Sequence, residues 1–172
     1  IEKIVGRAMY AMLAQLTRGV CFMDRDRFAL AIFDGTHHIS ASRDGQAELQ
    51  TFFRDGRKHA AAAAVGSHDP FDFGDEVTRG LIPIRFQMRQ RDETLARRGL
   101  DWVGLPVERY LLEVMTDLSP MGPDRKVPVD RRGEGIMRDV RGRYGKFRKT
   151  LPARPDRSQA VLSTPSAPAE IS

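Results

Sequence analysis

The chain has 172 residues, of which 41% are hydrophobic and 30% charged, so it can bury the core of one domain. It contains no run of about 18 apolar residues, which excludes a membrane-spanning helix, and its start lacks the residue order of a secretion signal. A single cysteine, Cys21, excludes an internal disulfide and a cysteine-rich zinc site, so we expect a cytoplasmic protein.

The longest amphipathic pattern stands at the start of the chain. Apolar residues recur every three or four positions over residues 1–16, which predicts a helix. The apolar runs 20–23 and 28–33 then predict a strand hairpin, and Asp34-Gly35 predicts a tight turn into a third strand over residues 37–42. Because both alternating faces of residues 28–33 are apolar, we expect this strand to be central and covered on two sides.

The next segments alternate helix and strand. Helical spacing predicts a helix around Leu49–Phe53, and the alanine run predicts another over residues 60–64. Residues 82–88 predict a strand at a sheet edge, because Pro83 cannot donate a hydrogen bond to a neighbouring strand. A last helix is predicted over residues 106–118. The expected class is α+β, with a small antiparallel sheet packed by the N-terminal helix and by this last helix.

The net charge of +5 is distributed unevenly along the chain. Residues 121–157 hold 12 Lys and Arg against 5 Asp and Glu, whereas residues 1–120 hold 16 against 17. We therefore divide the chain into a globular domain over residues 1–120, a basic arm over residues 121–157 and a disordered Ser/Pro/Ala-rich tail over residues 158–172.

Residues with the chemistry of a catalytic or metal site are few. His37 and His38 would point to opposite faces of their predicted strand and so would not share a metal ion. The acidic stretch of residues 67–76 does not have the ligand spacing of a calcium loop. The glycine motifs GxxxxGK[ST] and GxGxxG, which bind phosphates, are absent from the sequence. We therefore predict no catalytic residue, no metal and no cofactor.

Three segments, Phe28–Asp34, Ser42–Asp44 and Phe52–Gly56, together resemble the strand meander of class II glutamine amidotransferases of the asparagine-synthetase type. The catalytic residue of that family is a cysteine at the mature N-terminus, whereas this chain begins with Ile1. The resemblance therefore implies the interior of a larger amidotransferase, or a degenerate copy without its nucleophile, and no catalytic residue is carried over.

The basic arm holds the candidate binding residues. Apolar residues at helical spacing over residues 136–151 alternate with cations, which predicts a partly helical or disordered segment that orders on binding. Cations attract phosphates and aromatic rings stack on unpaired bases, so we predict contact with nucleic acid, preferentially single-stranded. The candidate residues are Arg138, Arg141, Arg143, Tyr144, Lys146, Phe147, Arg148 and Lys149.

Two other interpretations of the arm stay open. It could be a solvated tail that docks on its own domain, or a segment that binds an anionic membrane surface or the acidic groove of a partner. The leading functional hypothesis is a non-enzymatic binding or accessory module that contacts nucleic acid or another polyanion through the arm. The alternative hypothesis is a fragment of an amidotransferase-like enzyme, and the oligomeric state stays open.

Overall fold

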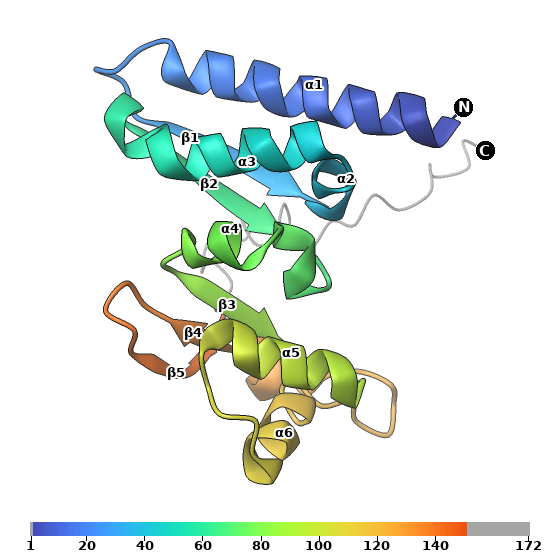
Figure 1. Cartoon of the computed structure of the whole chain (residues 1–172). Coiled ribbons are helices and arrows are strands. Elements are labelled where there is room, and N and C mark those ends of the chain that lie inside the picture. The colour runs from blue at the N-terminus through green and yellow to red at the C-terminus, as the bar shows by residue number, and fades with distance from the viewer. Residues whose placement is uncertain (1, 151–172) are drawn as a thin grey trace, which may run out of the picture.

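The computed structural model describes residues 2–150, and the side chains of residues 4–150. The α-helices are α1 (Glu2–Phe22), α2 (His37–Ser40), α3 (Arg43–Asp55), α4 (Glu76–Gly80), α5 (Glu93–Val103) and α6 (Arg109–Thr116) (Figure 1). The strands are β1 (Ala29–Asp34), β2 (Ala61–Gly66), β3 (Arg85–Met88), β4 (Glu134–Arg138) and β5 (Tyr144–Arg148). Short 3₁₀ helices are η1 (Gly56–His59), η2 (Pro70–Phe73) and η3 (Val129–Arg131). The expected α+β class with a small antiparallel sheet is confirmed.

The strands form two separate sheets. β1 and β2 pair in parallel, in a register that runs from Ala29 opposite Ala61 to Asp34 opposite Gly66. Parallel neighbours need a crossover connection, and α2 and α3 supply it here. The second sheet is antiparallel and has the strand order β3-β4-β5. The first half of the chain is therefore built around a β-α-β unit.

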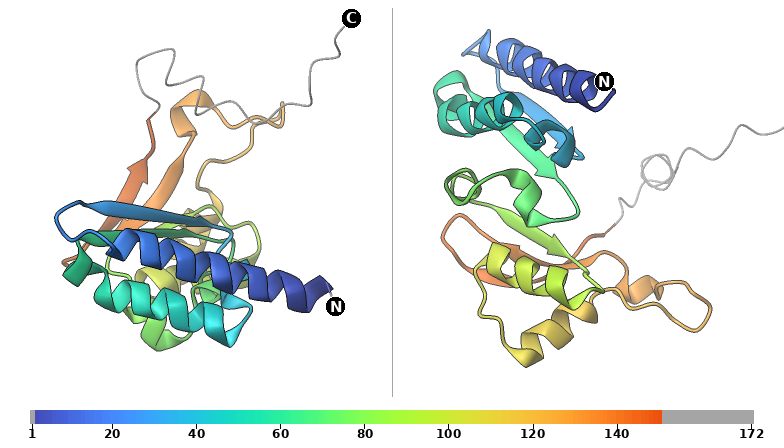
Figure 2. Two further views of the ribbon diagram at one scale, coloured as in Figure 1. Left: turned by 90° about the horizontal axis from the view of Figure 1, so that it is seen from above. Right: turned by 45° about the vertical axis from the view of Figure 1, so that its right-hand side comes forward.

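The first core lies between the β1–β2 pair and the helices α1 and α3, which lie side by side (Figure 1 and Figure 2). Arg18 of α1 and Glu48 of α3 join the two helices through an ion pair of 2.6 Å. Ser42 caps α3 by accepting a hydrogen bond from the amide of Gly45. Gly45 approaches the carbonyl of Ile39 so closely that a Cβ at this position would clash with it. The residues buried in this core are Ala14, Ala31, Phe33, Ile39, Leu49, Phe52 and Ala61.

The second core lies between α5, α6, η2 and the antiparallel sheet. Asp92 caps α5 by accepting from the amide of Leu95, and Gly104 ends this helix with a φ of 79°. The guanidinium of Arg85 lies 4.6 Å from the ring centroid of Trp102 and donates to the carbonyl of Trp102. Because these contacts place a β3 side chain against α5, they fix the sheet on this helix. The buried residues are Phe73, Ala96, Leu100, Trp102, Val103, Leu105, Met115, Leu118 and Ile136.

The predicted hairpin of residues 20–23 and 28–33 is wrong, as is the third strand over residues 37–42. The helix predicted over residues 1–16 is confirmed, but α1 continues to Phe22. The Phe22 ring stacks on that of His59, with centroids 4.3 Å apart, and this non-local contact favours the extra turn. Residues 37–42 contain α2, and the strand that pairs with β1 comes from residues 61–66 instead.

The helix predicted over the alanine run at residues 60–64 is also wrong, because four of these alanines lie in β2. The helix predicted around Leu49–Phe53 is confirmed as part of α3. The adjacent His37 and His38 do not point to opposite faces, since their ring centroids are 3.9 Å apart on α2. In the second half of the body, the strand at 82–88 and the helix at 106–118 are confirmed in shorter form, as β3 and α6.

The apolar face that predicted α1 is not buried as a whole, and β1 is not covered on both faces. Of the apolar positions that predicted α1, most are exposed, among them Leu16, and Ala14 supplies the buried contact instead. On β1, Leu30 and Ile32 face away from the helices, and Ile32 is 73% exposed. β1 is therefore covered on one face only in the described part of the chain.

The expected helical or disordered arm is corrected over residues 134–148, which form β4 and β5. β4 pairs with β3, so the antiparallel sheet joins residues on both sides of position 120. The residues predicted to form a disordered tail, 158–172, lie outside the described part of the chain.

Candidate functional site

The candidate residues of the arm lie on or next to the β4–β5 hairpin, in the half of the molecule that also holds α5 and α6, away from α1 (Figure 2). The amide of Asp139 donates to the carbonyl of Arg143 at 2.8 Å and closes the turn. The Asp139 carboxylate accepts hydrogen bonds from the amides of Arg141 and Arg143, and Gly142 takes a positive φ of 76°. These bonds lower the pKa of Asp139, the largest effect being the side-chain hydrogen bond from Arg143. The turn is thus held by its own residues.

Strand geometry separates the candidate residues onto two faces. Side chains alternate along a strand, so Tyr144, Lys146 and Arg148 lie on one face of β5. Arg138 is the cross-strand partner of Tyr144 and shares this face. Phe147 lies on the opposite face, where its ring meets that of Phe86 with centroids 5.6 Å apart and planes at 76°. The structure therefore brings together one aromatic ring, not two, with the cations.

Part of the positive charge on this hairpin is already paired. Arg143 forms an ion pair of 2.7 Å with Asp139, and Lys146 forms one of 2.9 Å with Glu134. Arg148 donates to the carbonyl of Asp130. Within residues 4–150, the side chains of Arg138, Arg141 and Lys149 form no ion pair with the protein. Arg141, in the turn between β4 and β5, and Lys149, directly after β5, are also exposed and are the cations most available to an anion.

The hairpin is anchored at its base by Glu134, a residue that the sequence analysis did not select. Glu134 is 6% exposed and accepts hydrogen bonds from Arg131, at 2.8 and 2.9 Å, and from the amide of Ser119, at 2.8 Å. The bond from Arg131 has the largest effect and, with help from Lys146 and Ser119, lowers the pKa of Glu134 to about 2 against the opposing effect of burial. No local signal distinguishes Glu134 from the other acids of residues 121–157.

A second place of interest is the carboxyl end of the parallel pair, where open α/β sheets bind ligands. β1 ends at Asp34, which is exposed, and Gly35 follows with a φ of 69°. The buried Thr36 donates its hydroxyl to the carbonyl of Gly66 at 3.1 Å and so ties this end of β1 to the end of β2. No three His, Cys, Asp or Glu residues of the described chain gather closely enough to hold a metal ion.

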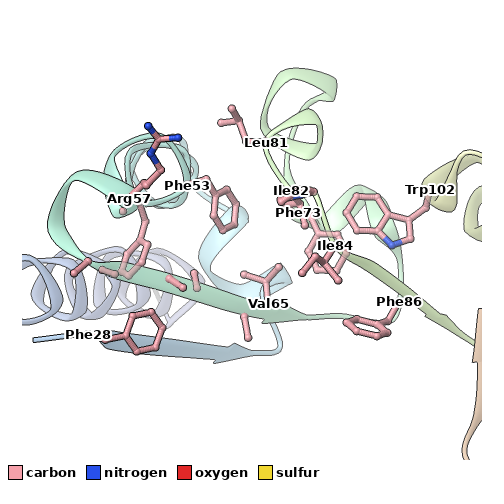
Figure 3. Close-up of a pocket in the computed structure, with 18 residues that line it drawn as sticks. Phe28, Phe53, Arg57, Val65, Phe73, Leu81, Ile82, Ile84, Phe86 and Trp102 are labelled. Atoms are coloured by element: carbon pink, nitrogen blue, oxygen red, sulfur yellow. The ribbon is translucent and has the colours of Figure 1, made fainter. Parts of the chain in front are cut away.

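A cavity of about 650 Å³ lies beside β2 (Figure 3). One wall is the strand itself, with its alanines and Val65, and another is the segment from Leu81 to Ile84 together with Phe86. Phe53 and Arg57 lie above the strand on the helical side. The lining is almost wholly apolar, and sequence periodicity did not reveal it because it arises between two sheets.

Comparison with protein families identifies the family of the chain. A family model described as an AAA-like domain matches residues 1–151, which is most of the chain. No curated protein matches the chain. The helices of residues 2–150 are not long and apolar enough to cross a membrane. The resemblance to class II glutamine amidotransferases is wrong, since the AAA-like match covers all three segments on which it rested and the strand meander is absent from those segments.

Proposed function

The chain belongs to the AAA-like domain family, and we propose that its function within that family is to contact single-stranded nucleic acid through one face of the β4–β5 hairpin. One observation carries this proposal: Tyr144 shares a strand face with Arg138, Lys146 and Arg148. Tyr144 is 58% exposed, so its ring is available to a base. The proposed contact residues are Tyr144 and the six cations among the eight residues predicted from the sequence; Phe147 packs against Phe86 on the opposite face and is not proposed to contact the nucleic acid.

The chemistry of this face suits an unpaired strand. The cations would neutralise phosphates and release counterions, which gives affinity without sequence preference. A base stacked on Tyr144 would add about 1–3 kcal/mol. Two-stranded β-ribbons are also used by known nucleic-acid readers. The ion pairs of Arg143 and Lys146 with acids of the hairpin would position these cations and reduce their net attraction for phosphate.

AAA-like domains are of the P-loop type, which implies a nucleotide and a magnesium ion. The residues present do not fit that group by themselves. A phosphate-binding glycine motif is absent from the sequence, and Asp34 at the end of β1 is followed by Gly35 rather than by a second acid. We therefore propose a binding role for these residues and derive no hydrolytic step.

Removing Arg141 of the β4–β5 turn and Lys149 after β5, which form no ion pair with the described residues, is expected to weaken binding and to reduce its salt dependence. Log K falls as log salt rises. In the double variant R141Q/K149Q, loss of two phosphate contacts should make this negative slope shallower by about 1.4. Fluorescence anisotropy with a labelled single-stranded oligonucleotide at several salt concentrations measures this slope. The control R25Q/R27Q removes the same charge from an exposed loop and should keep the wild-type slope. Equal losses in both variants would contradict a defined binding face.

Tyr144 and Phe147 are expected to differ although both are aromatic residues of β5. Y144L should weaken binding by about 1–3 kcal/mol, because it removes the stacking ring, and Y144F should bind like the wild type. F147L should leave the affinity unchanged, since Phe147 faces Phe86 on the other side of the sheet. The same titration measures all three variants. A wild-type chain that binds neither RNA nor DNA at low salt would refute the proposed function.

A further inference from the structure

The side of α1 that faces away from α3 and β1 is apolar and exposed. α1 is the topmost element in Figure 1, and no other described element lies beyond it (Figure 1 and Figure 2). Six uncharged residues on this side are each between 50% and 69% exposed. Their spacings of three, four and seven residues place them on one side of the helix. We call this set the outer stripe, and its members are Val5, Met9, Met12, Leu13, Leu16 and Val20.

The charged residues of this helix lie on its inner side instead. Ala14 is 3% exposed and marks the inner side. The two charged residues between positions 4 and 22 are Arg7, two turns before Ala14, and Arg18, about one turn after it. Ile4 is exposed but lies five turns from the half-buried Phe22, so it does not belong to the outer stripe. α1 is therefore amphipathic with its apolar side outward, which is the mark of a contact surface.

The outer stripe has the same spacing in both directions along the helix. Reversing α1 about the point midway between positions 12 and 13 places every member of the stripe on another member. The three pairs are Val5 with Val20, Met9 with Leu16, and Met12 with Leu13. A contact between identical subunits about a two-fold axis has this property, since residue i then meets residue j and j meets i. The spacing therefore favours a second copy of the chain as the partner.

The charge and size of the outer stripe agree with a reversible dimer. The stripe carries no charge into the contact, so no ion is buried without a partner. Membrane-bound amphipathic helices place cations beside their apolar face, whereas Arg7 and Arg18 lie on the other side of α1. Residues 5–20 form about 24 Å of helix, and half the surface of a cylinder about 12 Å across is roughly 450 Å² per copy. Two copies would bury close to the roughly 1,000 Å² that marks the lower limit of specific interfaces.

We propose that the outer stripe binds the outer stripe of a second copy in the antiparallel direction, about a two-fold axis that passes between Met12 and Leu13. The two bodies then lie on opposite sides of the paired helices, because α1 covers α3 and β1 from outside (Figure 1). The contact lies away from the β4–β5 hairpin, so the proposed nucleic-acid faces of both copies stay accessible (Figure 2). The dimer does not depend on the nucleic-acid contact.

Sedimentation equilibrium of the full chain over about 1–200 µM tests this contact. The wild-type mass should rise with concentration from that of one chain, 19.4 kDa, towards twice that value. M9E and L16K should each weaken association at least about tenfold, because each sets a charge against an apolar residue of the other copy. The double variant M9E/L16K should recover most of this loss, because the introduced acid then lies opposite the introduced base of the other copy.

The matched control is V129E, since Val129 lies on η3 and is 77% exposed. It should associate like the wild type. All variants should keep the helical signal in circular dichroism, because the substituted side chains are more than half exposed. Recovery in M9E/L16K also excludes misfolding as the cause of the single losses, since the double variant carries both substitutions.

Three outcomes would overturn the proposal. A wild-type chain that stays monomeric at about 200 µM would show that the outer stripe is free or is covered by something other than a second copy. Association that survives both M9E and L16K would place the contact elsewhere on the molecule. Loss in both single variants without recovery in M9E/L16K would refute the antiparallel pairing of positions 9 and 16.

Discussion

Replacing Phe52 by alanine is expected to lower the free energy of unfolding by about 3–5 kcal/mol, the range for deletion of a buried aromatic side chain. Phe52 is 2% exposed, and its ring lies 5.1 Å from that of Phe22 and 6.0 Å from that of Phe33, centroid to centroid. These contacts connect α3 to α1 and β1. A cavity at this position would therefore weaken the packing of α1, α3 and β1 together.

Urea unfolding followed by far-ultraviolet circular dichroism measures this loss as a lower midpoint with an unchanged slope. The matched control is F28A, because Phe28 is 68% exposed and its removal should change stability by no more than about 0.5 kcal/mol. Similar losses in the two variants would contradict the assignment of Phe52 to the core.

Replacing Glu134 by glutamine is expected to lower the free energy of unfolding by about 3 kcal/mol at pH 7. Glu134 is buried and accepts from Arg131, Lys146 and the Ser119 amide. Glutamine keeps one acceptor oxygen but replaces the other by an NH2 donor and removes the negative charge, so the cationic donors lose an acceptor and their counter-charge. Urea unfolding of both proteins measures the difference. The control E93Q removes an exposed carboxylate that pairs with Arg97, and should change stability by less than about 0.5 kcal/mol.

The contribution of Glu134 to stability is also expected to depend on pH. Its pKa is about 2 in the folded protein, below the ordinary value of 4.5, so the unfolded chain takes up its proton first as the pH falls. The stabilisation is complete above about pH 4.5 and is lost as the pH falls through about 2. Unfolding measured from pH 7 to pH 2 should therefore show the gap between wild type and E134Q narrowing below pH 4.5. A gap that stays constant over this range would contradict the charged network.

The candidate site was only partly predictable from the sequence. Composition correctly located a segment in which cations alternate with Tyr144 and Phe147. Its local structure was mispredicted, because two short strands and a tight turn place apolar residues at spacings that imitate a helix. That error also grouped Tyr144 with Phe147, which a strand separates onto opposite faces. Glu134 was missed because its role depends on Ser119 and Arg131, which fold back onto it.

Local pattern by itself determined that α1, α3 and α6 are helices, that β1 and β3 are strands and that positive charge gathers after residue 120. Helical periodicity and charge are properties of neighbouring residues, so they can be recognised without the fold. Tertiary structure alone decided that the alanine run is a strand, since alanine gains less than about 1 kcal/mol per residue as helix and β1 offers hydrogen bonds along its whole length. It also decided which apolar faces are buried. The outer faces of α1 and β1 and the cavity between β2 and β3 remain apolar and open, because burial depends on partners that local sequence does not specify.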